Sequence, residues 1–281
     1  MNNLYHSSLH DHYHQPELIS RILKALENSG FDLGNLHCED LQLLDEFHIR
    51  GQEATLEMAN LCALQENQVV LDLGCGIGGP ARFLARKFGC RVHGLDLVES
   101  YLEAAAVLTE MTGMEGRVSF RQGDMREMPF SDASFHRVWS QHTVMNIADK
   151  AALAAEVRRV LRPGGKAAFY EVCSTGTEPV HLPVPWAGKN EDSHLCSAPE
   201  LREFFKCSGL VEDFWEDVTT LSINWLDKLA ANLKQKPKTS GTRPGLGLLM
   251  GADAGLKSRN LGRNLREGRI VIVRGVFSRI D

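Results

Sequence analysis

A short apolar run followed by a glycine-rich turn constrains the fold more than any other stretch of this 281-residue chain. Residues 69–73 are apolar except for one acid, and residues 74–79 include four glycines. Residues 81–88 then place apolar side chains at helical spacing. A strand, a glycine turn and a helix in this order open the nucleotide-binding unit of α/β proteins, because a glycine backbone lets a ligand lie against the main chain. The stretch therefore predicts an α/β fold with a ligand at this turn.

A second acid strengthens this interpretation. Residues 91–96 read as the next strand and end in Asp96, about 20 residues after the glycines, where a carboxylate can accept hydrogen bonds from both ribose hydroxyls. A dinucleotide site uses G-x-G-x-x-G to seat a pyrophosphate on the helix N-terminus. Here Asp72 begins a D-x-G-x-G-x-G pattern instead. This pattern resembles the first motif of class I S-adenosylmethionine (SAM) methyltransferases, whose cofactor has no phosphate; a dinucleotide site and a turn without a ligand are the alternatives.

Composition and charge disfavour several classes of partner. The net charge is −5 and no cluster of lysine or arginine stands out, so a nucleic-acid substrate is not favoured. We find no signal peptide and no run of about 18 apolar residues, so we expect neither secretion nor a membrane span. Seven cysteines are scattered without a C-x-x-C pair, which is typical of reduced thiols in a cytoplasmic protein. The histidine-rich residues 1–15 read as a polar arm, and we expect no metal site.

The rest of the chain alternates strands and helices. Strands are expected at 69–73, 91–96, 117–121, 135–141, 166–172, 211–219 and 270–278. Helices are expected before the first strand at about 16–28, 39–47 and 52–63. We therefore divide the chain into an N-terminal arm and helical cap, residues 1–63, and a main domain, residues 64–281.

Two segments interrupt this alternation. Residues 174–197 are proline-rich and irregular, and we interpret them as a pocket loop, because a long loop inside a compact domain is usually functional. Residues 220–268 form an insertion that begins as a helix at 221–233. The insertion then becomes basic and glycine-rich, so we expect residues 234–247 to be mobile.

Several sequence blocks resemble one enzyme family. They lie at 46–49, 71–80, 88–92, 95–97, 123–124, 139–141, 149–150 and 160–165. Together they resemble bacterial class I SAM-dependent methyltransferases of the group that includes sarcosine/dimethylglycine N-methyltransferases. The resemblance implies an α/β, Rossmann-like class I methyltransferase fold: a mostly parallel seven-stranded sheet of order 3-2-1-4-5-7-6 with an N-terminal helical cap.

The same resemblance implies methyl transfer from SAM to a small-molecule acceptor, with an amine nitrogen as the first candidate. O- or S-methylation of a small metabolite, and a SAM-binding protein without turnover, are the alternatives. Two departures from the family pattern keep the acceptor open. Arg50 replaces a glycine of an F-H-x-G-G motif, and His142 and Asn146 replace an acid and a histidine after the fourth strand. For the assembly, we consider a homodimer.

The resemblance also assigns candidate residues to the cofactor. They occupy the glycine turn and the ends of the first four strands: Asp72, Gly74, Gly76, Gly78, Asp96, Leu97, Asp124, Met125 and Gln141. The carboxyl ends of parallel strands meet at one edge of a sheet, where ligands bind. We therefore expect these residues to line one pocket.

Candidates for the chemistry follow from what methyl transfer requires. The cofactor carries the reactive group, so the protein aligns the reactants, excludes water and removes a proton from the acceptor. His142 is the candidate base and Asn146 the residue that orients the acceptor; the alternative for His142 is a structural role in its loop. Candidate acceptor-binding residues are His48, Arg50, His181 and Trp186. Arg50 can pair with a carboxylate of SAM or of the acceptor, or form a surface ion pair.

Overall fold

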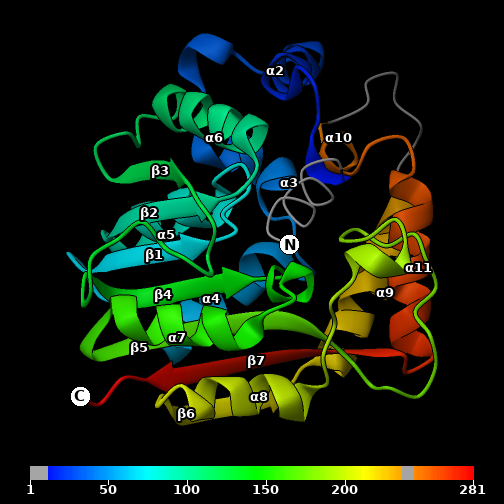
Figure 1. The fold of residues 1–281 in the computed structure, drawn as a ribbon. Helices are drawn as coiled ribbons and strands as arrows, with labels where there is room; N and C mark the ends of the chain where they lie inside the picture. The colour runs from blue at the N-terminus through cyan, green and yellow to red at the C-terminus, as the bar shows by residue number, and fades with distance from the viewer. Residues whose placement is uncertain (1–11, 236–243) are drawn as a thin grey trace.

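A seven-stranded sheet forms the centre of the protein, with the order β3-β2-β1-β4-β5-β7-β6 (Figure 1). The structure, a computed structural model, describes residues 12–235 and 244–281. The strands are β1 (Val69–Leu73), β2 (Arg91–Asp96), β3 (Val118–Gln122), β4 (Phe135–Gln141), β5 (Leu161–Ser174), β6 (Val211–Asp217) and β7 (Ile270–Ser278). Strands β1 to β5 form the parallel part of the sheet, and β7 runs antiparallel to both β5 and β6. The strand order implied by the resemblance, with a reversed last strand, is confirmed.

Strand β5 begins earlier than the sequence predicts. A proline and two glycines at 162–165 indicate a turn before a strand at 166–172, since both residue types disfavour strand interiors. In the structure Leu161 already pairs with Phe135 of β4, and the register shifts before Lys166 resumes the pairing. Strand β5 thus continues across residues 162–165, because β4 pairs with the residues before and after them.

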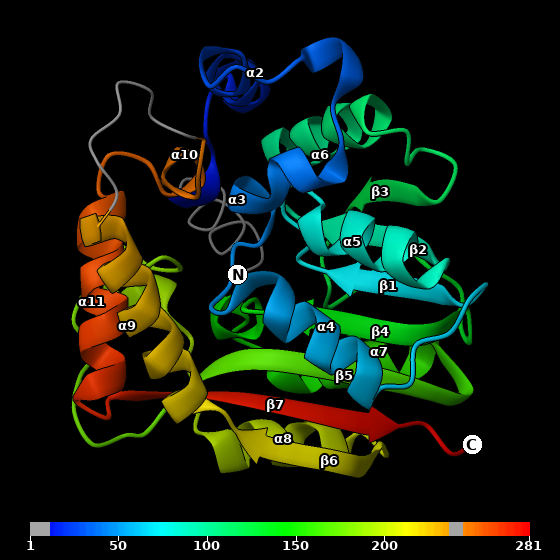
Figure 2. The same cartoon turned by 180° about the vertical axis from the view of Figure 1, so that it is seen from behind.

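Helices cover both faces of the sheet (Figures 1 and 2). One face carries α4 (Gly51–Leu61) and α5 (Gly79–Phe88), and the other carries α7 (Lys150–Val160) and α8 (Ala198–Cys207). Side chains alternate along a strand, so Val70 packs in the core beneath α4 and α5, whereas Leu71 packs beneath α7 and α8. Both residues are fully buried. The nearly continuous apolar run at 69–73 follows from this burial on two sides.

The N-terminal cap forms a third apolar core next to the carboxyl ends of β1 and β2. Its elements are α2 (Leu18–Asn28), the 3-10 helices η1 (Leu33–Asn35) and η2 (Cys38–Leu41), and α3 (Gln42–Asp45). Leu18, Ile22 and Leu26 are buried at helical spacing on α2, which packs against α6 (Glu99–Met111). The helix expected at 39–47 is divided between η2 and α3, whereas α2 and α4 lie close to the expected positions.

In the part of the chain that the structure describes, the insertion contains α9 (Thr219–Gln235), α10 (Gly247–Met250) and α11 (Ala254–Arg266). Helices α9 and α11 lie side by side beyond the carboxyl ends of the strands (Figures 1 and 2). Helix α9 confirms the helix expected at 221–233. The local sequence pattern does not predict α11, because few apolar side chains interrupt its arginines, asparagines and glycines. Of the segment expected to be mobile, residues 236–243 lie outside the described residues.

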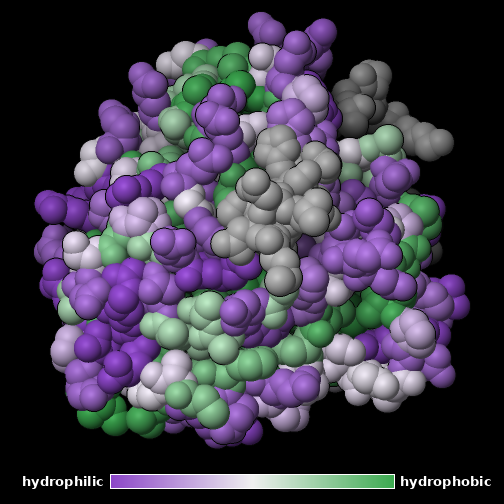
Figure 3. Space-filling view, viewed as in Figure 1, coloured by the Kyte–Doolittle hydropathy of each residue, from purple (hydrophilic) through white to green (hydrophobic). Residues whose placement is uncertain are grey.

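Hydrophilic side chains cover most of the face that Figure 3 shows, with hydrophobic areas between them. The larger exposed apolar side chains are Leu43, Val211, Leu221, Leu229, Leu256 and Ile280. Within residues 12–235 and 244–281, no helix is long and apolar enough to cross a membrane.

Candidate active site

A cavity opens at the carboxyl ends of β1, β2 and β4, between the sheet edge, the N-terminal cap and the helices of the insertion. Its lining from the sheet and its loops comprises Asp72, Gly74, Cys75, Gly76, Ile77, Pro80, Asp96, Leu97, Val98, Tyr101, Gly123, Asp124, Met125, Gln141, His142, Thr143, Met145, Asn146 and Ile147. The cap contributes Tyr13, Asp45, Phe47, His48 and Ile49, and the pocket loop contributes Pro185 and Trp186. The cavity therefore brings together most of the residues that the sequence assigns to the cofactor.

Asp96 holds the glycine turn in shape. Its Oδ2 accepts the Gly76 N–H at 2.8 Å, and its Oδ1 accepts the Val98 N–H at 3.0 Å. Gly76 has a φ of 54°, and the position of an added Cβ has no atom within 4 Å, so it faces open space. At Gly74, with a φ of 66°, an added Cβ would lie 2.3 Å from the side chain of Thr143. Gly76 is thus favoured by its backbone conformation, and Gly74 by its conformation and by the lack of room for a side chain.

Gly78 does not line the cavity, in contrast to the expectation that it contacts the cofactor. It is the N-cap of α5 with a φ of 80°, and an added Cβ would lie 2.6 Å from the ring of Phe120. Gly78 therefore lets α5 begin close against β3. The glycine spacing is correct for the turn, but its third position serves packing.

Asp72 supplies a buried carboxylate without a full set of partners. Its side chain is almost entirely buried at the end of β1, and among the described residues its Oδ2 has no hydrogen-bond partner. Burial raises the pKa of Asp72 well above its usual range, and the nearby carboxylates of Glu46 and Asp96 raise it further. A desolvated acid of this kind is stabilised by a cation placed against it. The site therefore fits a ligand with a positive charge near β1.

The loops after β2 and β3 and the last residue of β4 complete the end of the cavity near Asp72 and Asp96. Leu97 and Met125 give the cavity apolar walls, and Asp124 lines it while its carboxylate pairs with Arg126 at 2.6 Å. Gln141 is held in place because its Oε1 accepts the Trp139 Nε1–H at 2.7 Å. These residues lie where the sequence analysis expects them.

His142 follows β4 in a strained backbone conformation. Its φ is 51°, in the left-handed region that non-glycine residues rarely adopt, and its N–H donates to the Tyr170 carbonyl at 2.8 Å. Its ring stacks on Tyr170 with the two ring centroids 5.1 Å apart. Within the described structure its Nε2 is buried and has no hydrogen-bond partner. Burial holds the pKa of His142 well below its usual value, and neighbouring His48 lowers it further, so the ring is neutral near pH 7.

Glu171 supports this loop from behind, and the sequence analysis does not identify it. Its carboxylate accepts the Ser140 hydroxyl at 2.6 Å, the Thr143 N–H at 2.9 Å and the Val144 N–H at 3.1 Å. The side chain is fully buried, and this burial raises its pKa to about 7. A lone acid within the apolar run 167–173 is the signal that could have revealed it, because buried acids are rare without partners.

Asn146 lies at the cavity, as expected, with its amide bonded to two other segments. Its Oδ1 accepts the Tyr13 hydroxyl at 2.8 Å, and its Nδ2 donates to the Trp186 carbonyl at 2.9 Å. Tyr13 belongs to the N-terminal arm and Trp186 to the pocket loop. Asn146 therefore connects both segments to the loop that carries His142.

Comparison with known proteins identifies the domain that carries these residues. Residues 70–165 match a family model described as a methyltransferase domain. They form a methyltransferase domain. The cavity lies along this domain and extends beyond it into the cap and the insertion.

Relatives of the methyltransferase domain are diverse. The chain is 32% identical over 167 residues to methyltransferase GfsG of Streptomyces halstedii, covering 59% of this chain and 58% of the relative. It is 27% identical over 207 residues to dimethylglycine N-methyltransferase of Parasynechococcus marenigrum, covering 74% and 73%. The chain spans 30% to 61% of the lengths of the five curated relatives it matches first.

A solved structure shares the fold. Phosphoethanolamine N-methyltransferase 2 of Haemonchus contortus, in complex with SAM, aligns with a TM-score of 0.73 and 22% identity over 98% of this chain and 60% of that one. At this identity the likeness establishes the fold of the methyltransferase domain and its surroundings. It supports the class I architecture that the sequence implies.

Two of the four expected acceptor residues border the cavity of the methyltransferase domain. Trp186 is buried, and its Nε1 donates to the Ser193 hydroxyl at 3.0 Å. His48 is buried with its Nε2 2.8 Å from Glu46 Oε2 and its Nδ1 3.2 Å from the Ile49 carbonyl. Both nitrogens of His48 are engaged, so it contributes a wall and neither nitrogen is free for an acceptor.

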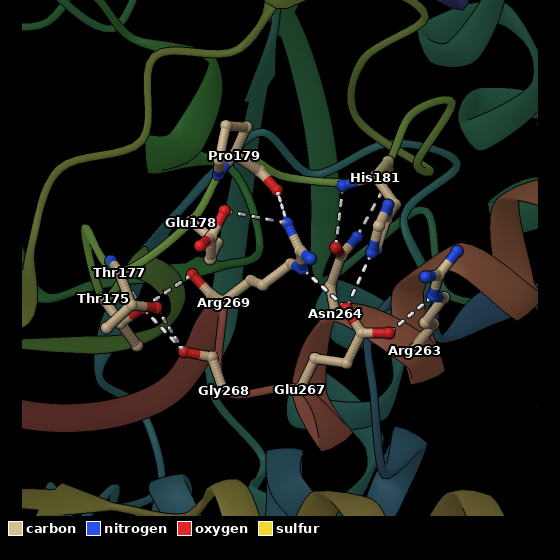
Figure 4. A network of polar contacts seen from close by, with 10 residues as sticks. All are labelled: Thr175, Thr177, Glu178, Pro179, His181, Arg263, Asn264, Glu267, Gly268 and Arg269. Atoms are coloured by element: carbon tan, nitrogen blue, oxygen red, sulfur yellow. Dashed lines mark hydrogen bonds and ion pairs between the residues drawn. The ribbon is translucent and has the colours of Figure 1, made fainter.

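Arg50 and His181 lie outside the cavity lining, contrary to the expectation that they bind the acceptor. Arg50 makes a two-pronged ion pair with Glu57 at 2.6 and 2.9 Å. The sequence alternative is a surface ion pair, whereas the Arg50 side chain is buried. His181 pairs with Glu267 at 2.7 Å, and Asn264 binds both the N–H and the carbonyl of His181 (Figure 4). These contacts bind the start of the pocket loop to the end of α11, and His181 does not line the cavity.

Replacing Asp96 by alanine should weaken SAM binding about 30- to 150-fold, because roughly 2–3 kcal/mol of charge-assisted hydrogen bonding is lost. Asp217→Ala is a matched control: Asp217 also ends a strand and accepts the N–H two residues on, from Thr219 at 2.8 Å, yet lies outside the cavity lining. Titration calorimetry with both variants should show loss of affinity for Asp96→Ala alone. Equal affinity in a folded Asp96→Ala variant would remove Asp96 from the cofactor site.

Replacing Glu171 by glutamine should change how stability depends on pH. The pKa of Glu171 rises from about 4.5 to about 7 on folding, so the folded chain holds a proton that the unfolded chain releases between these values. The stabilisation from this group is complete below its unfolded pKa and is lost as pH rises through 7, a change of up to about 3 kcal/mol. In urea unfolding, the free energy of unfolding of Glu171→Gln relative to the wild type should therefore be higher at pH 8 than at pH 5.

The variant Glu103→Gln, at an exposed position of α6, measures the background effect of losing a carboxylate. If the wild type and Glu171→Gln differ by the same free energy of unfolding at both pH values, Glu171 is ionised throughout and does not hold the proton.

Proposed function

We propose that the protein transfers the methyl group of SAM to a small-molecule acceptor bound beside His142. The observation that carries this proposal is the position of Asp72 and Asp96 at one end of a cavity that continues past His142. When bound, SAM supplies an electrophilic methyl group on a sulfonium and leaves as S-adenosylhomocysteine. The chain's task is to hold both partners, exclude water and accept a proton.

The cofactor-end residues suit the groups that SAM presents. Asp96 would accept hydrogen bonds from the ribose hydroxyls, and the incompletely partnered carboxylate of Asp72 would face the ammonium group. Leu97 and Met125 would flank the adenine base with apolar surface. Each role matches an observed property of the residue: charge, missing partner or apolar wall.

His142 is the residue placed to take the acceptor's proton. It lines the cavity, its Nε2 lacks a partner among the described residues, and its lowered pKa keeps the ring neutral at physiological pH. A neutral imidazole can accept a hydrogen bond from an amine or a hydroxyl and remove its proton as the new bond forms. An amine nitrogen remains the first candidate for the methylated atom, with O- or S-methylation as the alternative.

A SAM-binding protein without turnover is the competing function. Such a protein would need the site at Asp72 and Asp96 but no acceptor space. The cavity extends well beyond that site, to Trp186 and to helices α9 and α11, which favours an enzyme. Incubation with labelled SAM and cell extract, followed by identification of a labelled small molecule, tests this directly. Binding of SAM without any labelled product across extracts would favour the competing function.

We also propose a cytoplasmic location and retain a homodimer as the assembly to test. All seven cysteines are free thiols, the state that the reducing cytoplasm maintains. Light scattering of the purified chain would measure the assembly state.

Replacing His142 by alanine should lower kcat about 10²- to 10⁴-fold, the usual contribution of a positioned base, while SAM affinity stays nearly unchanged. The wild-type rate should be flat at neutral and alkaline pH and fall only in acidic buffer, because burial and His48 hold the pKa of His142 well below its usual value. The control is His93→Ala, which removes a histidine of β2 outside the cavity lining.

Rates would be measured with the acceptor found by the labelling experiment. Near-normal turnover in His142→Ala would give His142 a structural role in its loop, and loss of SAM binding would place it at the cofactor.

A further inference from the structure

The far side of the cavity is built from apolar side chains of the insertion. Helices α9, α10 and α11 and the residue before α10 contribute Trp225, Leu226, Leu229, Leu246, Leu249, Met250, Ser258 and Leu261. Ser258 is the polar member of this set. Phe47 and Ile49 of the cap and Trp186 of the pocket loop also line the cavity. We call this end of the cavity, defined by the eight insertion residues, the apolar lobe.

Among the described residues, the charged side chains that line the cavity have one sign. Its described lining contains four aspartates, at 45, 72, 96 and 124, and no lysine or arginine. Asp45 and Asp124 are paired with arginines, at 2.5 Å to Arg82 and 2.6 Å to Arg126. Asp72 and Asp96 lie at the cofactor end. In the described structure no cation therefore lines the apolar lobe; Lys257 lies outside the lining, and its Nζ donates to the Met250 carbonyl at 2.9 Å.

An anionic group in this lobe would lose its hydration without gaining a counter-charge, which is costly in a protein interior. Burial of apolar surface in the lobe instead stabilises a bound ligand. We infer that the acceptor is an apolar molecule without an anionic group, with its body against α9, α10 and α11 and its hydroxyl or amine toward His142. This inference rests on the proposed function, because it assigns the apolar lobe to the acceptor of that reaction.

The inference distinguishes this chain from two of its likenesses. Dimethylglycine carries a carboxylate and phosphoethanolamine a phosphate, and proteins named for methylating them resemble this chain. A site for either compound needs a cation near the acceptor. Arg50, the sequence candidate for that cation, is held by Glu57 outside the lining.

The first test compares two ligands that differ only in the charged end. Protein saturated with S-adenosylhomocysteine would be titrated with the uncharged fluorescent probe N-phenyl-1-naphthylamine, which would then be displaced by 1-decanol or by decanoate. Decanol should displace the probe at a concentration at least about tenfold lower than decanoate, because only decanoate must bury a charge. Equal displacement by the two compounds would overturn the inference.

Two leucines of α9 make a matched pair for locating the probe. Leu229 lines the cavity and is 41% exposed, whereas Leu221 is 44% exposed on the same helix and does not line it. Leu229→Asp should weaken probe binding about tenfold or more, and Leu221→Asp should leave it unchanged, with S-adenosylhomocysteine binding equal in both. Equal probe affinity in the two variants would show that the probe binds elsewhere and would overturn the inference.

A third variant tests the charge argument in the opposite direction. Leu226→Arg places a cation in the apolar lobe, so it should reverse the preference and make decanoate the better competitor. An unchanged preference for decanol would show that charge does not decide which ligand binds.

Binding of S-adenosylhomocysteine distinguishes a failure of the proposed function from a failure of the inference about the acceptor. If the wild type does not bind it, the proposed function and the inference both fail. If it binds while the apolar probe and decanol do not, the inference alone fails and the acceptor is polar.

Discussion

The contact of Asp96 with two backbone N–H groups is the constraint on which the candidate active site depends. One oxygen fixes Gly76 in the glycine turn, and the other fixes Val98 just before α6. The same carboxylate thus sets the shape of the cofactor end and the place where α6 begins. The cap packs on α6, so the position of its apolar core follows from this strand end as well.

Buried polar contacts of the same kind join the other parts. Arg82 of α5 is fully buried and donates to Asp45 of α3 at 2.5 Å and to Thr109 of α6 at 3.1 Å. Glu171 accepts a backbone N–H of the loop after β4, and Asn264 accepts a backbone N–H near the start of the pocket loop. Apolar cores on the two sheet faces supply most of the burial, whereas these few polar side chains decide how the loops meet.

The sequence predicts the sheet better than it predicts the partners of charged residues. Strand order and the positions of Asp72, Asp96 and Gln141 follow from short patterns that specify local structure and from the edge at which parallel strands end. Residue type alone suggests Arg50 and His181 as acceptor-binding residues. It cannot show that Glu57 and Glu267 pair with them. The polar helix α11 and the buried acid Glu171 depend on contacts distant in sequence, which local patterns do not reveal.

The left-handed backbone at His142 lowers the stability of the loop, while the residue keeps an imidazole at the cavity. Glycine and asparagine are the residues that adopt a φ of 51° at least cost, so either replacement would relieve strain in the loop. Selection for thermal stability alone would therefore tend to remove the imidazole from this position. A laboratory evolution campaign that screens only for heat resistance would favour more stable proteins that lack the proposed base, and thermostable variants of the chain should be chosen by turnover as well.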